Sequence, residues 1–146
     1  MTSRQWAYFD TSVLVKRYIK EAGSLATGRL LQRFRFLSSS ILPVEAMSAL
    51  SRRRASGDLA HRDFLAIQSR LRKDRDYWEL VEAGEPVLLQ AEELVQQTNV
   101  RTLDAIHLAS AMIFQAESRL TIPFITGDTK QRDAAHVLGF TVILVD

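Results

Sequence analysis

The feature that most constrains this fold is the alternation of short apolar runs with longer segments of helical periodicity. The runs fall at residues 6–9, 36–41, 78–81, 124–126 and 140–145. They are continuous rather than alternately apolar and polar, which is typical of strands covered on both faces by helices. The chain is therefore predicted to be an α/β domain with a short, mostly parallel central sheet of about four to five strands.

Helices are expected between these strands, and turn residues set their limits. Ser24 and Asp58 are predicted helix N-caps, Pro43 suits a first helical turn, and Gly57 suits the position after a helix end. The predicted helices cover residues 11–20, 24–34, 43–56, 59–71, 85–97, 103–116 and 129–138.

Composition limits the class of protein. The 146 residues fit a single domain, 1–146, and the 47% hydrophobic and 25% charged content is ordinary for a globular chain. The absence of cysteine excludes disulfides and cysteine-based zinc sites. The first apolar run is too short for a signal peptide or a membrane span, so a cytoplasmic location is expected. A net charge of +2 permits nucleic acid as a partner without requiring it.

Four acidic residues stand where such a sheet would gather them. Asp10 directly follows one predicted strand and Asp128 follows another after Gly127, and Glu45 and Asp104 lie in the first turns of predicted helices. Taken singly, each acid is explained more simply as a helix cap or as a complement to the helix dipole. Together they can meet at the carboxyl ends of parallel strands, where ligands bind in open α/β sheets.

Four carboxylates at one edge repel one another unless a cation offsets their charge. Hard oxygen ligands without cysteine suit Mg²⁺ or Mn²⁺. One or two such ions, held by acids, can activate water and stabilise the leaving oxygen in phosphodiester hydrolysis. The sequence therefore predicts a metal-dependent hydrolase.

The segments around these acids carry a resemblance. "FDTSVLVKRY", "LPVEAMSAL", "RTLDAIHLASA" and "FITGDTKQRDAAHVLGF" resemble the four acidic motifs of the PIN-domain ribonucleases, in order and over nearly the whole chain. The likeness is greatest to the VapC-type toxins of type II toxin–antitoxin pairs. It implies a three-layer α/β/α fold and a Mg²⁺- or Mn²⁺-dependent endoribonuclease. It also implies a homodimer silenced by a VapB-like antitoxin.

The resemblance also implies roles for particular residues. The predicted catalytic and metal-binding acids, in motif order, are Asp10, Glu45, Asp104 and Asp128. Thr11 or Ser12 matches a hydroxyl that supports the metal or the scissile phosphate, and Thr126 matches the hydroxyl at the end of the last motif strand. Asp133, five residues after Asp128, is the alternative fourth acid.

Other polar residues allow two interpretations. Lys16 and Arg17, and Arg52 and Arg53, can contact RNA or a partner chain, or can simply be solvated. His107 can share the helix face of Asp104, but packing or hydrogen bonding on the helix explains it more simply.

Three alternative functions each make a demand on particular residues of the sequence. A phospho-acceptor receiver module needs a second acid beside Asp10 and a lysine after the last strand, and the sequence has neither. A dehalogenase-like phosphatase needs an acid where Ser12 stands. A catalytically silent PIN-like domain that only binds RNA or protein would have lost one or more of the four acids, and all four are present.

Overall fold

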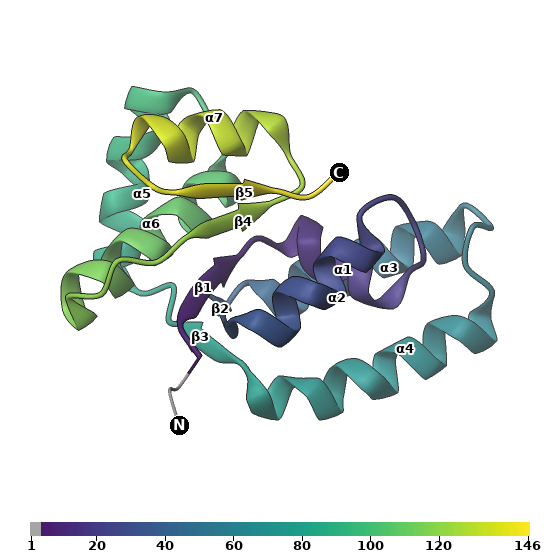
Figure 1. The fold of residues 1–146 in the computed structure, drawn as a ribbon. Coiled ribbons are helices and arrows are strands. Elements are labelled where there is room, and N and C mark those ends of the chain that lie inside the picture. The colour runs from purple at the N-terminus through teal and green to yellow at the C-terminus, as the bar shows by residue number, and fades with distance from the viewer. Residues whose placement is uncertain (1–3) are drawn as a thin grey trace.

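The central strand of the sheet comes first in the chain (Figure 1). The structure is a computed structural model that describes residues 4–146. It contains five strands: β1 (Trp6–Phe9), β2 (Arg35–Ser39), β3 (Glu79–Val81), β4 (Phe124–Thr126) and β5 (Val142–Leu144). They pair in the order β3-β2-β1-β4-β5, and every pair is parallel. All five carboxyl ends therefore meet at one edge, as the sequence predicted.

The helices form a layer on each face of this sheet (Figure 1). The first layer contains α1 (Thr11–Tyr18), α2 (Ser24–Arg33), α3 (Leu42–Ala55) and α4 (His61–Asp74), and a short 3-10 helix, η1 (Arg75–Tyr77), follows it. The second contains α5 (Glu85–Thr98), α6 (Thr102–Ser118) and α7 (Thr129–Val137). The three-layer α/β/α prediction is thus confirmed.

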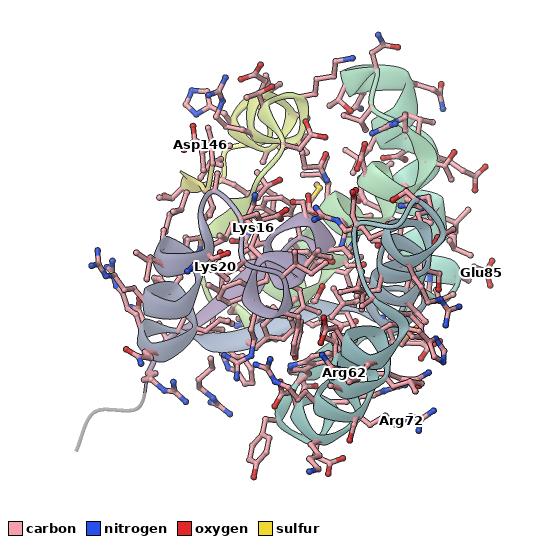
Figure 2. The ribbon with its side chains drawn as sticks, turned by 90° about the vertical axis from the view of Figure 1, so that its right-hand side faces the viewer. Lys16, Lys20, Arg62, Arg72, Glu85 and Asp146 are labelled. Atoms are coloured by element: carbon pink, nitrogen blue, oxygen red, sulfur yellow. The ribbon has the colours of Figure 1, made fainter. Side chains whose placement is uncertain are left out.

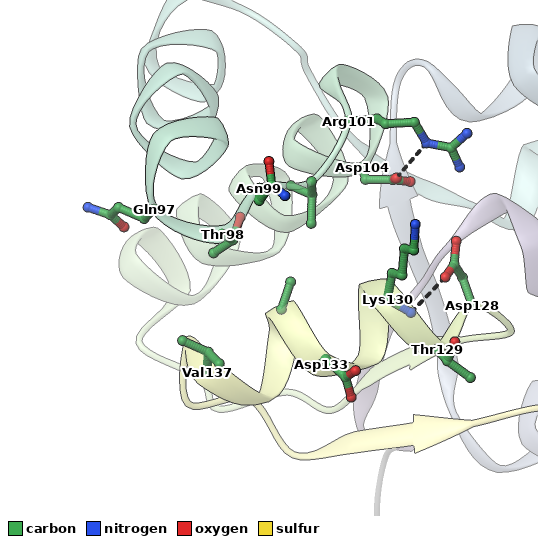
Figure 3. A pocket seen from close by; sticks show the side chains of 12 residues that line it. Gln97, Thr98, Asn99, Arg101, Asp104, Asp128, Thr129, Lys130, Asp133 and Val137 are labelled. Carbon is green, nitrogen blue, oxygen red and sulfur yellow. Dashed lines mark hydrogen bonds and ion pairs between the residues drawn. The ribbon is translucent and has the colours of Figure 1, made fainter.

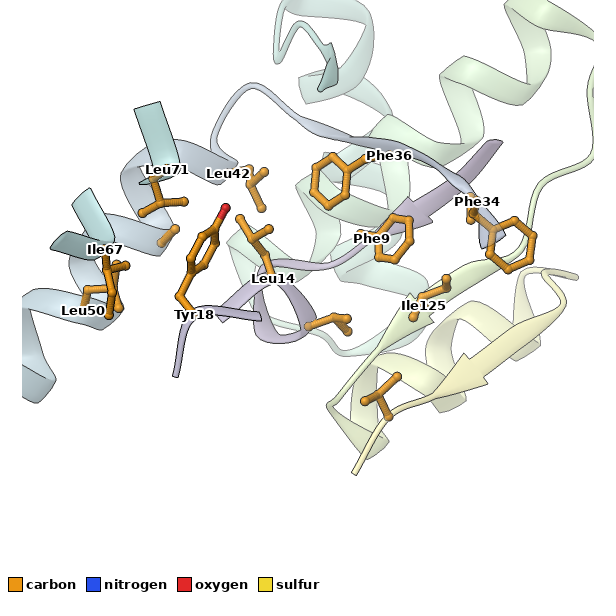
Figure 4. Packing of buried hydrophobic residues seen from close by; sticks show 14 of the residues in the cluster. Phe9, Leu14, Tyr18, Phe34, Phe36, Leu42, Leu50, Ile67, Leu71 and Ile125 are labelled. Atoms are coloured by element: carbon orange, nitrogen blue, oxygen red, sulfur yellow. The ribbon is translucent and has the colours of Figure 1, made fainter. Parts of the chain in front are cut away.

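The alternation of side chains along β1 divides the interior into two cores. Ala7 and Phe9 face the core beneath α1, α3 and α4, whereas Tyr8 faces the core beneath α5, α6 and α7. Figure 4 shows Phe9 stacked near Phe36 in the first core, with ring centroids 4.9 Å apart. Because both faces of β1 are covered, its whole sequence has to be apolar.

Strand limits differ from the predictions by up to two residues. The second strand ends at Ser39 rather than Ile41, and the last covers only Val142–Leu144. Phe140 and Val145 are buried but lie outside β5. The Phe140 amide donates to the Ala135 carbonyl, which closes the end of α7. Burial, rather than strand pairing, explains why these residues are apolar.

Helix ends were predicted with mixed success. Gly57 follows the end of α3 with φ +88°, and Pro43 lies in its first turn, as expected. Asp58 does not cap α4, which begins at His61 after Ala60. Ser24 is not the cap of α2 either; Gly23 holds that position with φ +87°. A Cβ at Gly23 would lie 2.8 Å from Val145, so the turn packs directly against the end of the chain.

Charged side chains cover the outer surface of the helices (Figure 2). Arg62 and Arg72, both on α4, are exposed, whereas Phe64, Ile67 and Leu71 are the buried residues of that helix. None of the helices in residues 4–146 is long and apolar enough to cross a membrane.

Candidate active site

Asp10 stands between the central strand and the first helix. Its carboxylate caps α1 by accepting from the Ser12 amide at 3.3 Å. Its other oxygen accepts from the Thr126 hydroxyl at 2.9 Å. The side chain is only 6% exposed, so these donors replace the water that a carboxylate would otherwise require. Asp10 is therefore both a helix cap and part of the acidic edge, a name we give to Asp10, Glu45, Asp104 and Asp128.

Asp128 lies at the neighbouring strand end. It caps α7, accepting from the amides of Lys130 at 2.8 Å and Gln131 at 3.4 Å. The Asp128 amide donates in turn to the Thr126 hydroxyl at 3.1 Å. Thr126 thus joins the two acids, since one hydroxyl donates to Asp10 and accepts from the backbone of Asp128.

Asp104 carries a negative charge in unfavourable surroundings. Burial, together with the charges of Asp10 and Asp128, raises the pKa of Asp104 above 3.8. Arg101, whose Nε lies 3.5 Å from Oδ2, acts in the opposite direction without overcoming them. The charges of these three acids therefore repel, as the sequence predicted for acids gathered at one edge.

Glu45 has different surroundings, although it lies near Asp104. Its Oε1 accepts from the Thr11 hydroxyl at 2.7 Å and lies 2.6 Å from Nε2 of His107. Burial acts to raise the pKa of Glu45, but the hydrogen bond and charge of His107 and the bond from Thr11 outweigh it and lower that pKa below 4.5. Glu45 is therefore ionised and held by two donors.

His107 lies fully within the second core, with 1% exposure. Its Nδ1 is 2.7 Å from the Tyr8 hydroxyl. Burial acts to lower the pKa of His107, whereas the hydrogen bond to Glu45 and the nearby acids raise it, and the net result is a pKa above 6.5. The expectation that His107 packs is met by its burial, but the alternative of hydrogen bonding on its own helix is wrong, because its partners Tyr8 and Glu45 lie on β1 and α3.

The donor chemistry of the acidic edge fits a hard divalent ion. In residues 4–146 no three acidic or histidine side chains lie close enough together to form a ready-made metal cage. Mg²⁺ does not require one, because it keeps several waters and binds through one or two carboxylates together with substrate phosphates. The repulsion at Asp104 is the feature that a cation would relieve.

A groove opens at the acidic edge between the loop after α5 and helix α7 (Figure 3). Its volume is about 690 Å³, and Asp104, Asp128 and Asp133 all line it. Arg101 and Lys130 bring positive charge to its walls. A second cavity of about 380 Å³ is shared by Glu45, Arg101 and Asp104. Glu45, Asp104 and Asp128 therefore face open space, whereas Asp10 is buried and lines neither cavity.

The supporting hydroxyls predicted from the sequence have separate partners. Thr126 holds Asp10, and Thr11 holds Glu45. Ser12 accepts from the Gly127 amide at 3.0 Å, which ties the start of α1 to the loop after β4. A Cβ at Gly127 would lie 3.1 Å from the Val145 carbonyl, so this close approach favours glycine.

The predicted basic contacts lie partly within intramolecular pairs. Arg53 pairs with Glu21 at 2.6 Å, and Arg17 pairs with Asp74 at 3.3 Å. Lys16, labelled in Figure 2, donates to the Ala22 carbonyl at 2.9 Å. Arg52 bonds Ser48 on its own helix. Lys16, Arg52 and Arg53 nevertheless border a cavity of about 600 Å³ that also reaches Ser12.

The alternative fourth acid differs from Asp128 in its environment. Asp133 lies one turn farther along α7, with 69% of its side chain exposed, and pairs with Arg132. The charges that raise the pKa of Asp104 come from Asp10 and Asp128, and Asp133 is not among their sources. The charge of Asp128 thus acts on Asp104, and Asp133 lies farther along the groove.

Sequence reasoning missed Arg101, Gln131 and Tyr8. The Gln131 amide donates to the Asp104 carbonyl at 2.9 Å and so ties α7 to the first turn of α6. Arg101 lies three residues before Asp104, and this helical spacing was a usable signal. Tyr8 gave no such signal because it reaches His107 across 99 residues of sequence.

The parallel sheet between two helical layers and its acidic edge define a PIN-like domain, and the chain matches the PIN domain over residues 7–137. This chain belongs to the PIN-domain family. Within that family it is similar to Ribonuclease VapC46 of Mycobacterium tuberculosis, with 36% identity over 138 residues, 93% of this chain and 95% of that protein.

Solved structures share the fold. FitAcB from Neisseria gonorrhoeae has a TM-score of 0.67 at 16% identity, covering 94% of this chain and 96% of that one. VapBC2 from Rickettsia felis, bound to a DNA fragment from its promoter, has a TM-score of 0.65 at 16% identity, covering 97% of this chain and 100% of that one. At this identity the likeness is one of fold alone.

Proposed function

We propose that this protein is a Mg²⁺- or Mn²⁺-dependent endoribonuclease, and that it acts as the toxin of a toxin–antitoxin pair. The observation that carries the proposal is the repulsion of Asp104 by Asp10 and Asp128 at the opening of a groove. Similarity to a VapC ribonuclease along 93% of the chain supports the choice of RNA as substrate.

Asp10, Asp104 and Asp128, with Glu45 beside them, would hold the metal ion. When bound, the ion would supply an activated water and stabilise the charge that develops on the scissile phosphate. The residues of this chain orient the acids for that task. Thr126 fixes Asp10, the amides of α7 fix Asp128, and Thr11 with His107 fixes Glu45.

The groove between the 97–101 loop and α7 is the proposed path of the RNA strand. Arg101 and Lys130 stand on its walls and would neutralise phosphates on either side of the acidic edge. Asn99 and Gln97 also line it and offer amide groups that can hydrogen-bond to unstacked bases. The substrate is therefore proposed to be single-stranded or looped RNA.

A VapB-like antitoxin is the proposed partner. One solved structure with this fold is a toxin–antitoxin complex from Klebsiella pneumoniae, with a TM-score of 0.64. On this chain Val44, Met47 and Trp78 border a groove of about 450 Å³ between α3 and α4, with Arg72 and Arg75 also lining it. An amphipathic helix with acidic flanks would suit that groove. A cytoplasmic homodimer belongs to the same proposal, and light scattering of the purified protein would test the dimer.

The decisive experiment is cleavage of total RNA by purified protein in Mg²⁺, in Mn²⁺ and in EDTA. Asp10→Asn is the test variant, and Asp58→Asn, an exposed carboxylate in the loop before α4, is the matched control. We expect cutting that requires metal, that Asp10→Asn abolishes and that Asp58→Asn preserves.

The second candidate function is a catalytically silent PIN-like domain that binds RNA or protein. It would give no cutting in any metal, yet would retain RNA binding measured by filter retention. Cutting that persists in EDTA, or in Asp10→Asn, would contradict the proposed use of the acidic edge.

A further inference from the structure

A continuous chain of polar contacts runs from the second core to the acidic edge. It begins at the Tyr8 hydroxyl, which is 2.7 Å from Nδ1 of His107. It continues from Nε2 of His107 to Oε1 of Glu45 at 2.6 Å. Tyr8 and His107 are 0% and 1% exposed, so no water competes for either contact. Elements far apart in the sequence, β1, α6 and α3, are joined by these two contacts.

The chemistry of the groups gives the chain a direction. An ionised carboxylate only accepts hydrogen bonds, so Nε2 of His107 must carry the proton and donate to Glu45. The Tyr8 ring is stacked on Phe124 with centroids 5.2 Å apart, which fixes its hydroxyl on the central sheet. The Tyr8 hydroxyl therefore anchors His107 at Nδ1, and the N–H at Nε2 points to Glu45.

Both donors to Glu45 converge on the same oxygen. The Thr11 hydroxyl donates to Oε1 at 2.7 Å, beside the contact from His107. Within the part of the chain that the structure describes, no hydrogen bond involves Oε2. Glu45 also lines the cavity that it shares with Asp104 and Arg101. One carboxylate oxygen is thus fixed, and the other is left for a ligand in that cavity.

We propose that His107 is a positioning residue: anchored by Tyr8, it holds Glu45 by Oε1 so that Oε2 is presented to a divalent cation or its bound water beside Asp104. The proposal rests on the proposed function for its activity test. Its structural part, that His107 sets the orientation of Glu45 and through it the affinity for a divalent ion, can be measured without RNA.

The matched variants are His107→Leu, His107→Gln and Tyr8→Phe. Glutamine can place an amide N–H near the position of Nε2, whereas leucine fills the space without a donor. We expect His107→Leu to lower kcat about 10–100-fold, the usual effect of removing a group that orients a metal ligand, with KM for RNA little changed. His107→Gln should recover most of that loss. Tyr8→Phe, which keeps the ring packing, should lower kcat less than His107→Leu.

A double-mutant cycle shows whether His107 acts through Glu45. In a Glu45→Gln background, His107→Leu should cause little further loss of kcat, because the group it positions has already been changed. If the two losses multiply, His107 does not act through Glu45 and the proposal is overturned. Equal kcat in His107→Leu and wild type would overturn it as well.

Two measurements without RNA separate this inference from the proposed function. In the metal-free protein, Glu45→Gln should shift the Nε2 signal of His107 in imidazole ¹⁵N NMR much more than the Nδ1 signal. Mn²⁺ affinity, measured by electron paramagnetic resonance, should fall in His107→Leu and be retained in His107→Gln. If these hold while wild type cuts no RNA, the nuclease proposal fails and the positioning role stands. If wild type cuts RNA while Mn²⁺ affinity is unchanged in His107→Leu, only the positioning role fails.

Discussion

The hydroxyl of Thr126 donates to the carboxylate of Asp10 across the junction of two neighbouring strands, at a distance of 2.9 Å. Both residues are buried, and they lie 116 positions apart in the sequence. The contact exists because β1 and β4 are parallel neighbours that end at the same edge. It brings the first and last motifs of the chain into one site.

Removing this hydroxyl should impair the site more than the fold. Thr126→Val keeps the shape but leaves Asp10 without one donor and the Asp128 amide without its acceptor. We expect RNA cleavage to fall about 10–100-fold and the free energy of unfolding to fall by about 1–3 kcal/mol. Thr126→Ser, which retains the hydroxyl, is the control. Equal cleavage by the valine and serine variants would show that this hydroxyl does not orient Asp10.

Removing the charge of Asp104 should stabilise the metal-free protein. The pKa of Asp104 is raised in the folded state, so its ionisation costs stability, and this cost is absent below the ordinary value of 3.8. It is fully present above the raised pKa. The Tm of Asp104→Asn in EDTA should therefore exceed that of wild type at pH 7, and the difference should shrink as the pH falls toward 4. A lower Tm for the variant at pH 7 would mean that Arg101 outweighs the other acids.

Divalent metal should reverse the order of the two Tm values, so that wild type becomes more stable than Asp104→Asn. Binding to the folded state alone adds about 2.7 kcal/mol of stability at a metal concentration 100 times Kd. We expect Mn²⁺ to raise the Tm of wild type, and to raise that of Asp10→Asn and Asp104→Asn much less. Differential scanning calorimetry over a Mn²⁺ series measures this directly. An undiminished increase in both variants would place the ion elsewhere.

Arg101 should contribute to RNA binding through charge. Its side chain is 87% exposed beside the groove, so Arg101→Ala should leave the Tm nearly unchanged. If Arg101 neutralises one phosphate of single-stranded RNA, its removal should reduce the slope of log affinity against log salt by about 0.7. Fluorescence anisotropy with the Asp10→Asn protein, which should not cut the RNA, measures that slope. Arg62→Ala, on the exposed side of α4, is the matched control and should leave it unchanged.

The sequence was sufficient to predict the acidic edge because parallel strands carry their carboxyl ends to one side. Asp10 and Asp128 could be placed together without knowing any contact, since Asp10 directly follows β1 and Asp128 follows β4 after a single glycine. Glu45 and Asp104 required only the first turn of a helix that begins at the same edge. Topology alone therefore predicts these positions.

The contacts of His107 could not be predicted in the same way. Its partners lie 62 and 99 residues away, and only the packing of α6 against the sheet brings them together. Buried histidines in helices are common, and periodicity does not distinguish one that packs from one that donates to an acid. Asp58 is a different case. The sequence predicts it as a helix cap because aspartate suits that role, but α4 begins three positions later, at His61.

The order of the strands has a consequence for the timing of synthesis. β1 occupies the middle of the sheet, but the end of its neighbour β4, at Thr126, is translated 116 residues after Asp10. At roughly 5–20 residues per second, that interval lasts about 6–23 s. A nascent chain therefore has its first acid long before its last, so the acidic edge is complete only after β4 and the loop that follows it have been made.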